Sequence, residues 1–211
     1  MSLNGGMSMI ELNKLSTGYS RDKPLLKDFN YKFDAKIYGV LGESGCGKTT
    51  LLRTVAGLIK PIDGQVLVDG NIVTKASKNN IYMMHQNYTS FDWLKCLDNV
   101  LIAKKIRGKL EEKDVAEAKE LLSLVGLSES MGKYPKQLSG GMRQRLALAR
   151  TLFANPDVVL MDEPLSALDS CTRNKMQNLI VEQHQRSNNT IIMVTHSKEE
   201  AKKMCDVIIE F

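Results

Sequence analysis

Gly42-Glu-Ser-Gly-Cys-Gly-Lys48-Thr49 is the stretch that decides the fold of this 211-residue chain. It matches the pattern G-x-x-x-x-G-K-[ST], and it lies between the apolar run 37–41 and a segment of helical character, 48–56. In such a strand–loop–helix arrangement the glycines let backbone N–H groups point at phosphate oxygens, and the helix N-terminus adds its dipole. We therefore expect a phosphate-binding loop, with Lys48 reaching the β- and γ-phosphates and the Thr49 hydroxyl on Mg²⁺.

A second informative stretch is Val158-Val-Leu-Met-Asp-Glu163, an apolar strand that ends in two acids. Ligands of open α/β sheets bind at the carboxyl ends of the strands, so these acids are expected beside the phosphate loop. We predict that Asp162 holds the Mg²⁺ shell and that Glu163 takes a proton from, or orients, the attacking water. The alternative is that both acids only cap the helix expected after Pro164.

The pattern along the rest of the chain predicts an α/β fold. Helices and strands alternate in the last third, as helix 139–154, strand 158–161, helix 174–185, strand 190–194, helix 198–204 and strand 207–211. Such alternation predicts a mainly parallel sheet with helices on both faces. Shorter strands are predicted earlier in the chain, at 10–16, 30–34, 37–41, 65–68 and 81–84. Residues 111–125 carry apolar side chains three and four apart, which predicts an amphipathic helix.

Composition narrows the class of protein. The apolar fraction of 43% and the charged fraction of 25% are those of an ordinary globular chain. The net charge of +5 is spread among acids rather than gathered in a run, so we expect a solvated surface and no nucleic-acid partner. The four cysteines lie far apart without a CxxC pair, which favours reduced thiols over a zinc site.

The chain carries no sequence signal for crossing or leaving a membrane. No run approaches the ~20 apolar residues that a membrane helix needs, and the first residues lack the order of a secretory signal. Residues 1–6 are polar and glycine-rich, and we expect them to be a vector-derived extension rather than part of the fold.

Leu138-Ser-Gly-Gly-Met-Arg-Gln-Arg145 resembles the signature motif of ATP-binding cassette (ABC) proteins. Ser139 followed by Gly140 and Gly141 at a helix start makes a second anion-binding N-terminus with a hydroxyl cap. A cap alone would gain nothing from two glycines, which cost helix stability. The resemblance implies that this motif reaches, across a head-to-tail dimer, the γ-phosphate bound by a partner subunit.

Further family landmarks follow in order along nearly the whole chain. Tyr19 resembles the aromatic residue that stacks on adenine, and Gln86 resembles the Q-loop glutamine. Ser166-Ala-Leu-Asp169 resembles the D-loop, and His196 the switch histidine. Singly, each also fits a plain structural role, such as a loop aromatic or a histidine that closes a strand. Together they imply that Gln86 links the metal site to a helical insert, Asp169 organises the dimer interface and His196 contacts the γ-phosphate.

The expected cofactors are ATP and Mg²⁺, and the expected site has three groups of residues. Catalytic roles are assigned to Glu163, His196 and Gln86. Metal contacts are assigned to Thr49, Gln86 and Asp162. Contacts to the nucleotide are expected from Tyr19, Gly42, Glu43, Ser44, Gly45, Cys46, Gly47, Lys48, Thr49, Thr50, Ser139, Gly140, Gly141 and Asp169.

The resemblance also implies the architecture of a P-loop NTPase of the ABC ATPase type. One domain is expected over residues 7–211, with a mainly parallel core sheet and two subdomains. An N-terminal antiparallel β subdomain would take residues 7–35 and 62–75, and a helical subdomain residues 87–141. The P-loop core would take 36–61, 76–86 and 142–211.

Within the family, the sequence resembles prokaryotic importer subunits. Phe91-Asp-Trp-Leu-Lys-Cys-Leu-Asp-Asn-Val100 resembles the Pro-Trp-x-x-x-x-x-Asn-Val segment of nitrate, sulfonate and taurine systems, although Asp92 stands where proline is expected. Ser197 likewise follows His196 where importers usually carry Asp. The resemblance implies an ATPase subunit that dimerises on ATP, as a homodimer or pseudo-symmetric dimer. It would dock on a separate transmembrane permease at the cytoplasmic face of the membrane, served indirectly by an extracytoplasmic solute-binding protein.

Two alternative functions stay open at this point. One is the motor of an exporter or lipoprotein-releasing complex, whose signature more often carries glutamines after the two glycines. The other is a soluble ABC ATPase that acts on nucleic acid, for which the net positive charge is the only support. The transported substrate is not predicted.

Overall fold

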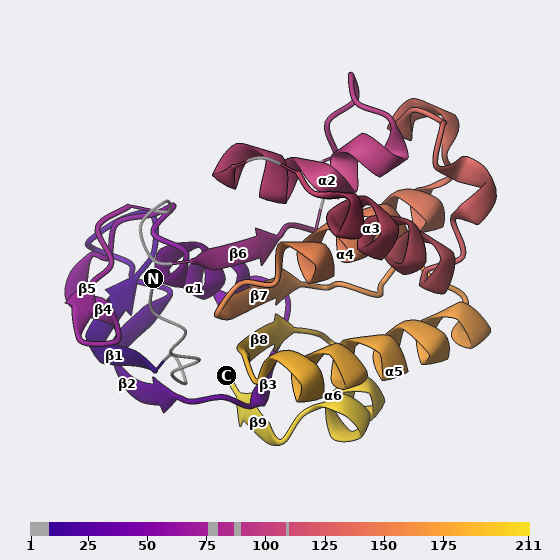
Figure 1. Cartoon of the computed structure of the whole chain (residues 1–211). Coiled ribbons are helices and arrows are strands. Elements are labelled where there is room, and N and C mark those ends of the chain that lie inside the picture. The colour runs from indigo at the N-terminus through magenta and orange to yellow at the C-terminus, as the bar shows by residue number, and fades with distance from the viewer. Residues whose placement is uncertain (1–8, 76–79, 87–89, 109) are drawn as a thin grey trace. The chain divides into compact units, whose positions relative to one another are not determined.

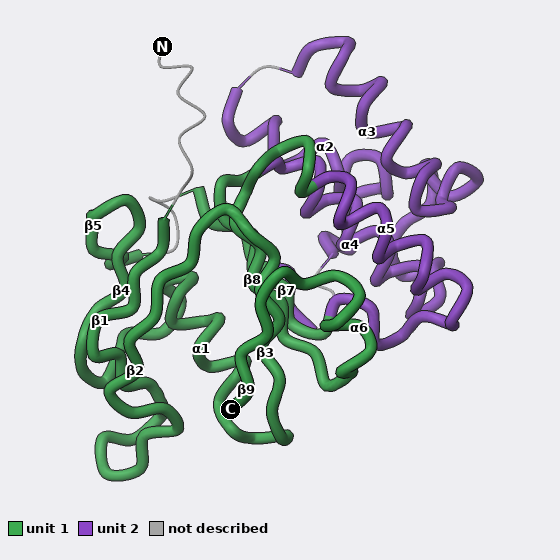
Figure 2. Tube along the Cα trace, turned by 90° about the horizontal axis from the view of Figure 1, so that it is seen from below, with its two compact units in different colours: residues 1–83, 156–163, 184–211 green, residues 84–155, 164–183 purple. Residues whose placement is uncertain are grey.

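A computed structural model describes residues 9–75, 80–86, 90–108 and 110–211 (Figure 1). The chain forms two compact units, which Figure 2 shows in different colours. Unit 1 comprises residues 1–83, 156–163 and 184–211, and unit 2 comprises 84–155 and 164–183. Residues 1–6, expected to be a vector-derived extension, lie outside the described residues. In the described ranges, no helix has both the length and the apolar character that crossing a membrane requires.

A five-stranded sheet forms the centre of unit 1 (Figure 1). Its strands, in the order β6-β7-β8-β3-β9, are Ile81–Met84, Val158–Asp162, Thr190–Val194, Ile37–Leu41 and Val207–Glu210. β3 pairs in parallel with β8 and β9, and β7 pairs in parallel with β8. Every residue of β3, β7 and β8 is buried, as expected for strands covered on both faces. The expected parallel core sheet is thus confirmed.

A four-stranded antiparallel sheet makes the rest of the β structure of unit 1. Its strands, in the order β2-β1-β4-β5, are Leu26–Phe33, Ile10–Thr17, Asp63–Val68 and Asn71–Ile72. β2 begins four residues before the predicted strand 30–34, because Leu26 pairs with Thr17 across an irregular register. Asp28 takes a left-handed φ of 51° within that stretch. The polar residues at the start of β2 therefore form a strand because they pair with β1. Their sequence shows no alternation of apolar and polar residues that would predict it.

Helix α1, Lys48–Val55, packs against both sheets of unit 1. Leu51, Leu52 and Val55 are buried in one apolar cluster with side chains of β1, β3, β4, β7 and β8. Burying a side chain of this size stabilises the fold by about 1.5–3 kcal/mol. The glycine-rich loop directly precedes α1. The packing of α1 therefore fixes the N-terminus of the helix, next to the loop. Helix α6, Lys198–Met204, packs on β3, where Ala201 and Cys205 lie against Gly39.

Unit 2 is helical. It contains α2 (Cys96–Arg107), α3 (Glu112–Leu124), α4 (Gly140–Ala154), most of α5 (Ser170–Ser187) and the short 3₁₀ turns Ser128–Ser130 and Pro135–Gln137. α2, α3 and α4 pack on one another, and Arg145 of α4 donates to the carbonyls of Val125 and Gly126 after α3, at 2.6 and 3.0 Å. α5 starts four residues before the predicted helix 174–185, since Asp169 caps it by accepting the Thr172 N–H at 3.0 Å. The subdomain boundaries expected from the sequence stay a prediction.

Candidate nucleotide-binding site

The glycine-rich loop has a backbone that needs glycine. Gly45 has a φ of 86° and Gly47, the N-cap of α1, a φ of 104°. Side chains strongly disfavour these left-handed angles. A Cβ on Gly47 would also come within 2.9 Å of the Leu25 Cβ. The loop therefore turns the chain directly from β3 into the N-terminus of α1, the position that favours a bound anion.

Lys48 brings a positive charge into this loop. Its side chain is folded back, and Nζ donates to the carbonyls of Gly42 and Glu43 at 2.8 and 2.7 Å. Cys46 Sγ lies 3.7 Å from the same ammonium. Glu43 and Ser44 are exposed, whereas Thr50 is buried in the first turn of α1. An ammonium beside a glycine-rich turn and a helix N-terminus is the combination that binds polyphosphate.

Thr49 and Asp162 come together from positions 113 residues apart. The Thr49 hydroxyl, in the first turn of α1, donates to the Asp162 carboxylate at the end of β7, at 3.0 Å. Asp162 is 3% exposed. Hydroxyl and carboxylate oxygens are ligands that Mg²⁺ takes in phosphate-binding sites, so this donor set fits the expected metal.

Glu163 and His196 also meet, at the ends of two neighbouring strands. Oε1 of Glu163 lies 3.4 Å from Nδ1 of His196. Glu163 has a left-handed φ of 51°, and its backbone N–H donates to the Val194 carbonyl of β8 at 3.0 Å. That conformation costs roughly 1–2 kcal/mol for a residue with a side chain. The two residues that the sequence predicts to be catalytic in unit 1 are therefore neighbours.

Tyr19 lies in the loop after β1 with 73% of its surface exposed, which leaves its ring available for stacking. The other predicted residues belong to unit 2. Gln86 is exposed after β6. Asp169 is exposed at the start of α5, and the hydrogen bond from the Thr172 N–H lowers the pKa of its carboxyl.

Ser139 begins α4 as predicted. Its Oγ accepts the Met142 N–H at 3.3 Å, which makes it the N-cap. A Cβ on Gly141 would lie 3.3 Å from the Ala167 carbonyl, whereas one on Gly140 would meet no atom within 4 Å. Packing among the described residues thus gives no reason for Gly140, although glycine weakens a helix by roughly 1 kcal/mol.

Gln144 is a buried polar residue that the sequence analysis did not single out. It is fully buried in α4, and its Oε1 accepts the Ala167 N–H of the D-loop at 3.0 Å. The signature stretch and the D-loop are therefore joined within unit 2. A polar residue on the apolar face of a predicted helix was the available signal.

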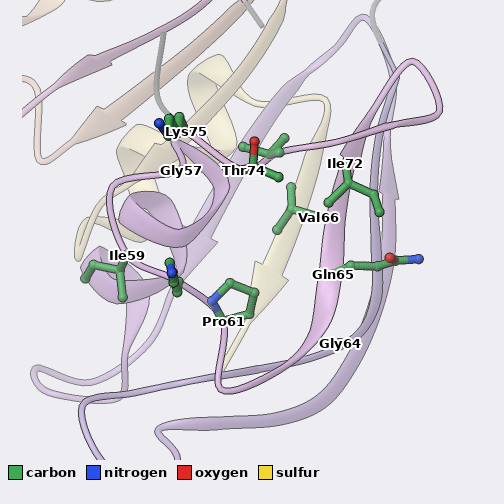
Figure 3. A pocket seen from close by; sticks show the side chains of 11 residues that line it. Gly57, Ile59, Pro61, Gly64, Gln65, Val66, Ile72, Thr74 and Lys75 are labelled. Carbon is green, nitrogen blue, oxygen red and sulfur yellow. The ribbon is translucent and has the colours of Figure 1, made fainter. Parts of the chain in front are cut away.

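A cavity of about 450 Å³ in unit 1 is separate from the predicted site residues (Figure 3). It lies between the segment after α1 and the strands β4 and β5, with Pro61, Val66 and Ile72 among its walls. The described residues that line it include none of the predicted site residues.

Known proteins of one family are similar to this chain. Residues 26–166 match the family model described as ABC transporter. An uncharacterized ABC transporter ATP-binding protein of Bacillus subtilis is 46% identical over 182 residues, 85% of this chain and 70% of the relative. A taurine import ATP-binding protein of a Jannaschia species is 45% identical over 79% of this chain and 62% of its own length. The chain thus matches only part of these relatives.

Solved structures give the same fold. A dimeric ATP-binding cassette in a post-hydrolysis state, bound to ADP and phosphate, superposes with a TM-score of 0.84 at 29% identity. The match covers 96% of this chain and 94% of that cassette.

Proposed function

This chain belongs to the ABC transporter family, and from that premise we propose that it binds MgATP, dimerises on it and hydrolyses it to power solute import through a separate permease. One observation carries the proposal. The pair Thr49–Asp162, at 3.0 Å, and the pair Glu163–His196, at 3.4 Å, stand in the same unit as the phosphate loop.

Binding begins at the phosphate loop. Its N–H groups and the N-terminus of α1 receive the phosphate oxygens, and Lys48 moves its ammonium from the loop carbonyls to the β- and γ-phosphates. Tyr19 stacks on adenine. Mg²⁺ held by Thr49 and Asp162 would neutralise charge on the β- and γ-phosphate oxygens.

Hydrolysis depends on positioning and proton handling, because phosphoryl transfer leaves the protein little covalent chemistry to do. Glu163 orients the attacking water or accepts its proton. His196, whose Nδ1 lies 3.4 Å from the Glu163 carboxylate, contacts the γ-phosphate. Gln86 links the metal and water site to the helical insert.

A second copy completes the site. Ser139 and the open position at Gly140 present a capped helix N-terminus, which suits the γ-phosphate held by a partner subunit. Asp169 organises the interface between copies. The dimeric state of the solved cassette supports this arrangement.

The transport role is supported by the names of relatives. Proteins named for taurine import and for sulfate/thiosulfate import are 45% and 40% identical to this chain. We infer that the chain docks on a transmembrane permease at the cytoplasmic face and that an extracytoplasmic solute-binding protein delivers the solute. Reconstitution of the chain with its permease in vesicles, followed by ATP-dependent solute accumulation, tests this part.

Phosphate release by the purified chain tests the enzymatic part. We expect hydrolysis that requires Mg²⁺, stops with EDTA and has a specific activity that rises with protein concentration as dimers form. Activity per chain that is independent of concentration would contradict the dimeric site. Absence of phosphate release would refute the proposed ATPase.

A further inference from the structure

Hydrogen bonds link the two neighbours of His196 in the chain, Thr195 and Ser197, to Glu200 of α6. The Thr195 hydroxyl donates to Oε2 of Glu200 at 2.5 Å and accepts the backbone N–H of Ser197 at 3.1 Å. Ser197 Oγ in turn accepts the Glu200 N–H at 3.2 Å. Thr195 is 3% exposed and Glu200 7% exposed. The residues on both sides of His196 are thereby fixed to the first turn of α6.

The network is a modified helix cap. Ser197 and Glu200 have the S-x-x-E spacing of a capping box, in which the glutamate normally accepts the N–H of the capping serine directly. Here the Thr195 hydroxyl stands between the Ser197 N–H and the carboxylate. Thr195 directly follows β8, and its N–H donates to the Val40 carbonyl of β3 at 3.3 Å. The cap therefore connects α6 to the core sheet. Starting a helix requires no such tie.

The burial of Glu200 also exceeds what a cap needs. Its second carboxylate oxygen, Oε1, is buried without a hydrogen-bond partner among the described residues. A surface cap would leave that oxygen in water, and burying it costs free energy. Capping α6 therefore does not by itself explain a buried carboxylate at this position.

We propose that Thr195 and Glu200 are positioning residues for His196. They hold the backbone on either side of His196, so that its ring stays 3.4 Å from Glu163 while its other edge faces the γ-phosphate. This role rests on the proposed ATPase function. Neither residue touches the substrate, and both act through the histidine.

The first test compares two buried threonines at opposite ends of β8, Thr195, which directly follows the strand, and Thr190, its first residue. Thr195→Val removes the hydroxyl, and we expect kcat to fall about tenfold, since small misplacements of catalytic groups are costly. The KM for ATP should stay within about twofold, because the phosphate loop is untouched. Thr195→Ser keeps the hydroxyl and should restore kcat.

Thr190→Val is the matched control. Thr190 begins β8, is fully buried, and its hydroxyl donates to the Asp34 carbonyl at 2.8 Å. The variant should unfold at a lower temperature with kcat unchanged. Equal losses of kcat in Thr190→Val and Thr195→Val would overturn the positioning role, because general destabilisation would then explain both. If Thr195→Val does not fold, Ser197→Ala removes the half-buried hydroxyl of the same network and should lower kcat about threefold with KM unchanged.

The second test combines Thr195→Val with His196→Ala. If Thr195 acts through His196, adding Thr195→Val should lower kcat no further, since residues that act as a unit are not additive. A full additional tenfold loss would overturn the proposal. A lack of hydrolysis by the unaltered chain is a distinct result, which refutes the proposed ATPase and the positioning role with it.

Discussion

Units 1 and 2 use their predicted site residues in different ways. In unit 1 four of these residues pair: the Thr49 hydroxyl donates to Asp162, and Glu163 lies 3.4 Å from His196. In unit 2, Ser139 and Asp169 accept backbone N–H groups at the starts of α4 and α5. We infer that the predicted residues of unit 1 serve a nucleotide bound to the same chain, and that the signature stretch of unit 2, residues 138–145, faces a nucleotide held by a partner copy. Changes in unit 1 should therefore alter binding or turnover, and changes at the signature of unit 2 should alter association.

Glu163→Gln should have the largest effect. The amide keeps the shape of the side chain but does not accept a proton, so we expect turnover to fall by roughly 100-fold or more. ATP binding should persist, because the phosphate loop and the Thr49–Asp162 pair are unchanged, and dimers should accumulate with ATP. Phosphate release and light scattering measure the two effects. Glu199→Gln, at an exposed site on α6, is the control and should leave phosphate release and dimer formation unchanged. Hydrolysis at the normal rate in Glu163→Gln would show that Glu163 is not the base.

Ser139→Arg tests the other unit. An arginine at the start of α4 places bulk and charge on the surface expected to face a partner copy, so ATP-dependent dimers and turnover should both be lost. Titration with a fluorescent ATP analogue should still give the affinity of the unaltered chain. Combining the change with Glu163→Gln makes the contrast sharper, because dimers trapped by the second substitution should disappear. Dimers that persist in this double variant would break the division of roles between the units.

The local parts of the site could be predicted from the sequence, because they depend on the order of residues. The phosphate loop is a strand, a glycine-rich turn and a helix in succession, and the acids at 162 and 163 end an apolar strand. The Thr49–Asp162 contact follows from those two facts and the rule that parallel strands bind ligands at one edge. The expected roles of these residues stay proposals.

What could not be predicted depends on three-dimensional pairing. The left-handed φ of Glu163 arises where its N–H meets the Val194 carbonyl. The early start of β2 depends on pairing with β1, and the early start of α5 on the Asp169 cap. The Thr195–Glu200 bond needs a hydroxyl inserted into a capping box, for which sequence spacing gives no signal.

Lys48→Ala should have an intermediate effect, on binding rather than turnover alone. It removes a charged donor to the phosphates, and hydrogen bonds to charged groups contribute about 1.5–3 kcal/mol, so ATP affinity should fall roughly 10- to 150-fold. Isothermal titration with MgATP measures it. Lys60→Ala, an exposed lysine at the separate cavity, should leave the affinity unchanged. Equal losses in both variants would show that general charge, rather than the loop, attracts the nucleotide.

The smallest expected effect is on the stability of unit 2 in acid. Asp114 accepts the Glu111 N–H at the start of α3 and the Lys104 ammonium, at 2.9 and 3.0 Å, and these contacts lower the pKa of its carboxyl. A carboxyl with a lowered folded-state pKa stabilises the fold above its unfolded pKa, about 3.9, and that contribution is lost as pH falls through the folded value. Stability of unit 2 should therefore decline as the pH is lowered below about 4.

Asp114→Asn should make that decline shallower, because the amide keeps an acceptor for the Glu111 N–H but carries no titrating charge. Trp93 is the chain's single tryptophan and lies in unit 2, so its fluorescence during urea unfolding reports on this unit. Midpoints measured between about pH 6 and about pH 3 should converge for Asp114→Asn and the unaltered chain at the acid end. Glu120→Gln, an exposed site on the same helix, should keep the full slope. Parallel pH profiles for Asp114→Asn and the unaltered chain would mean that other carboxylates set the acid response of unit 2.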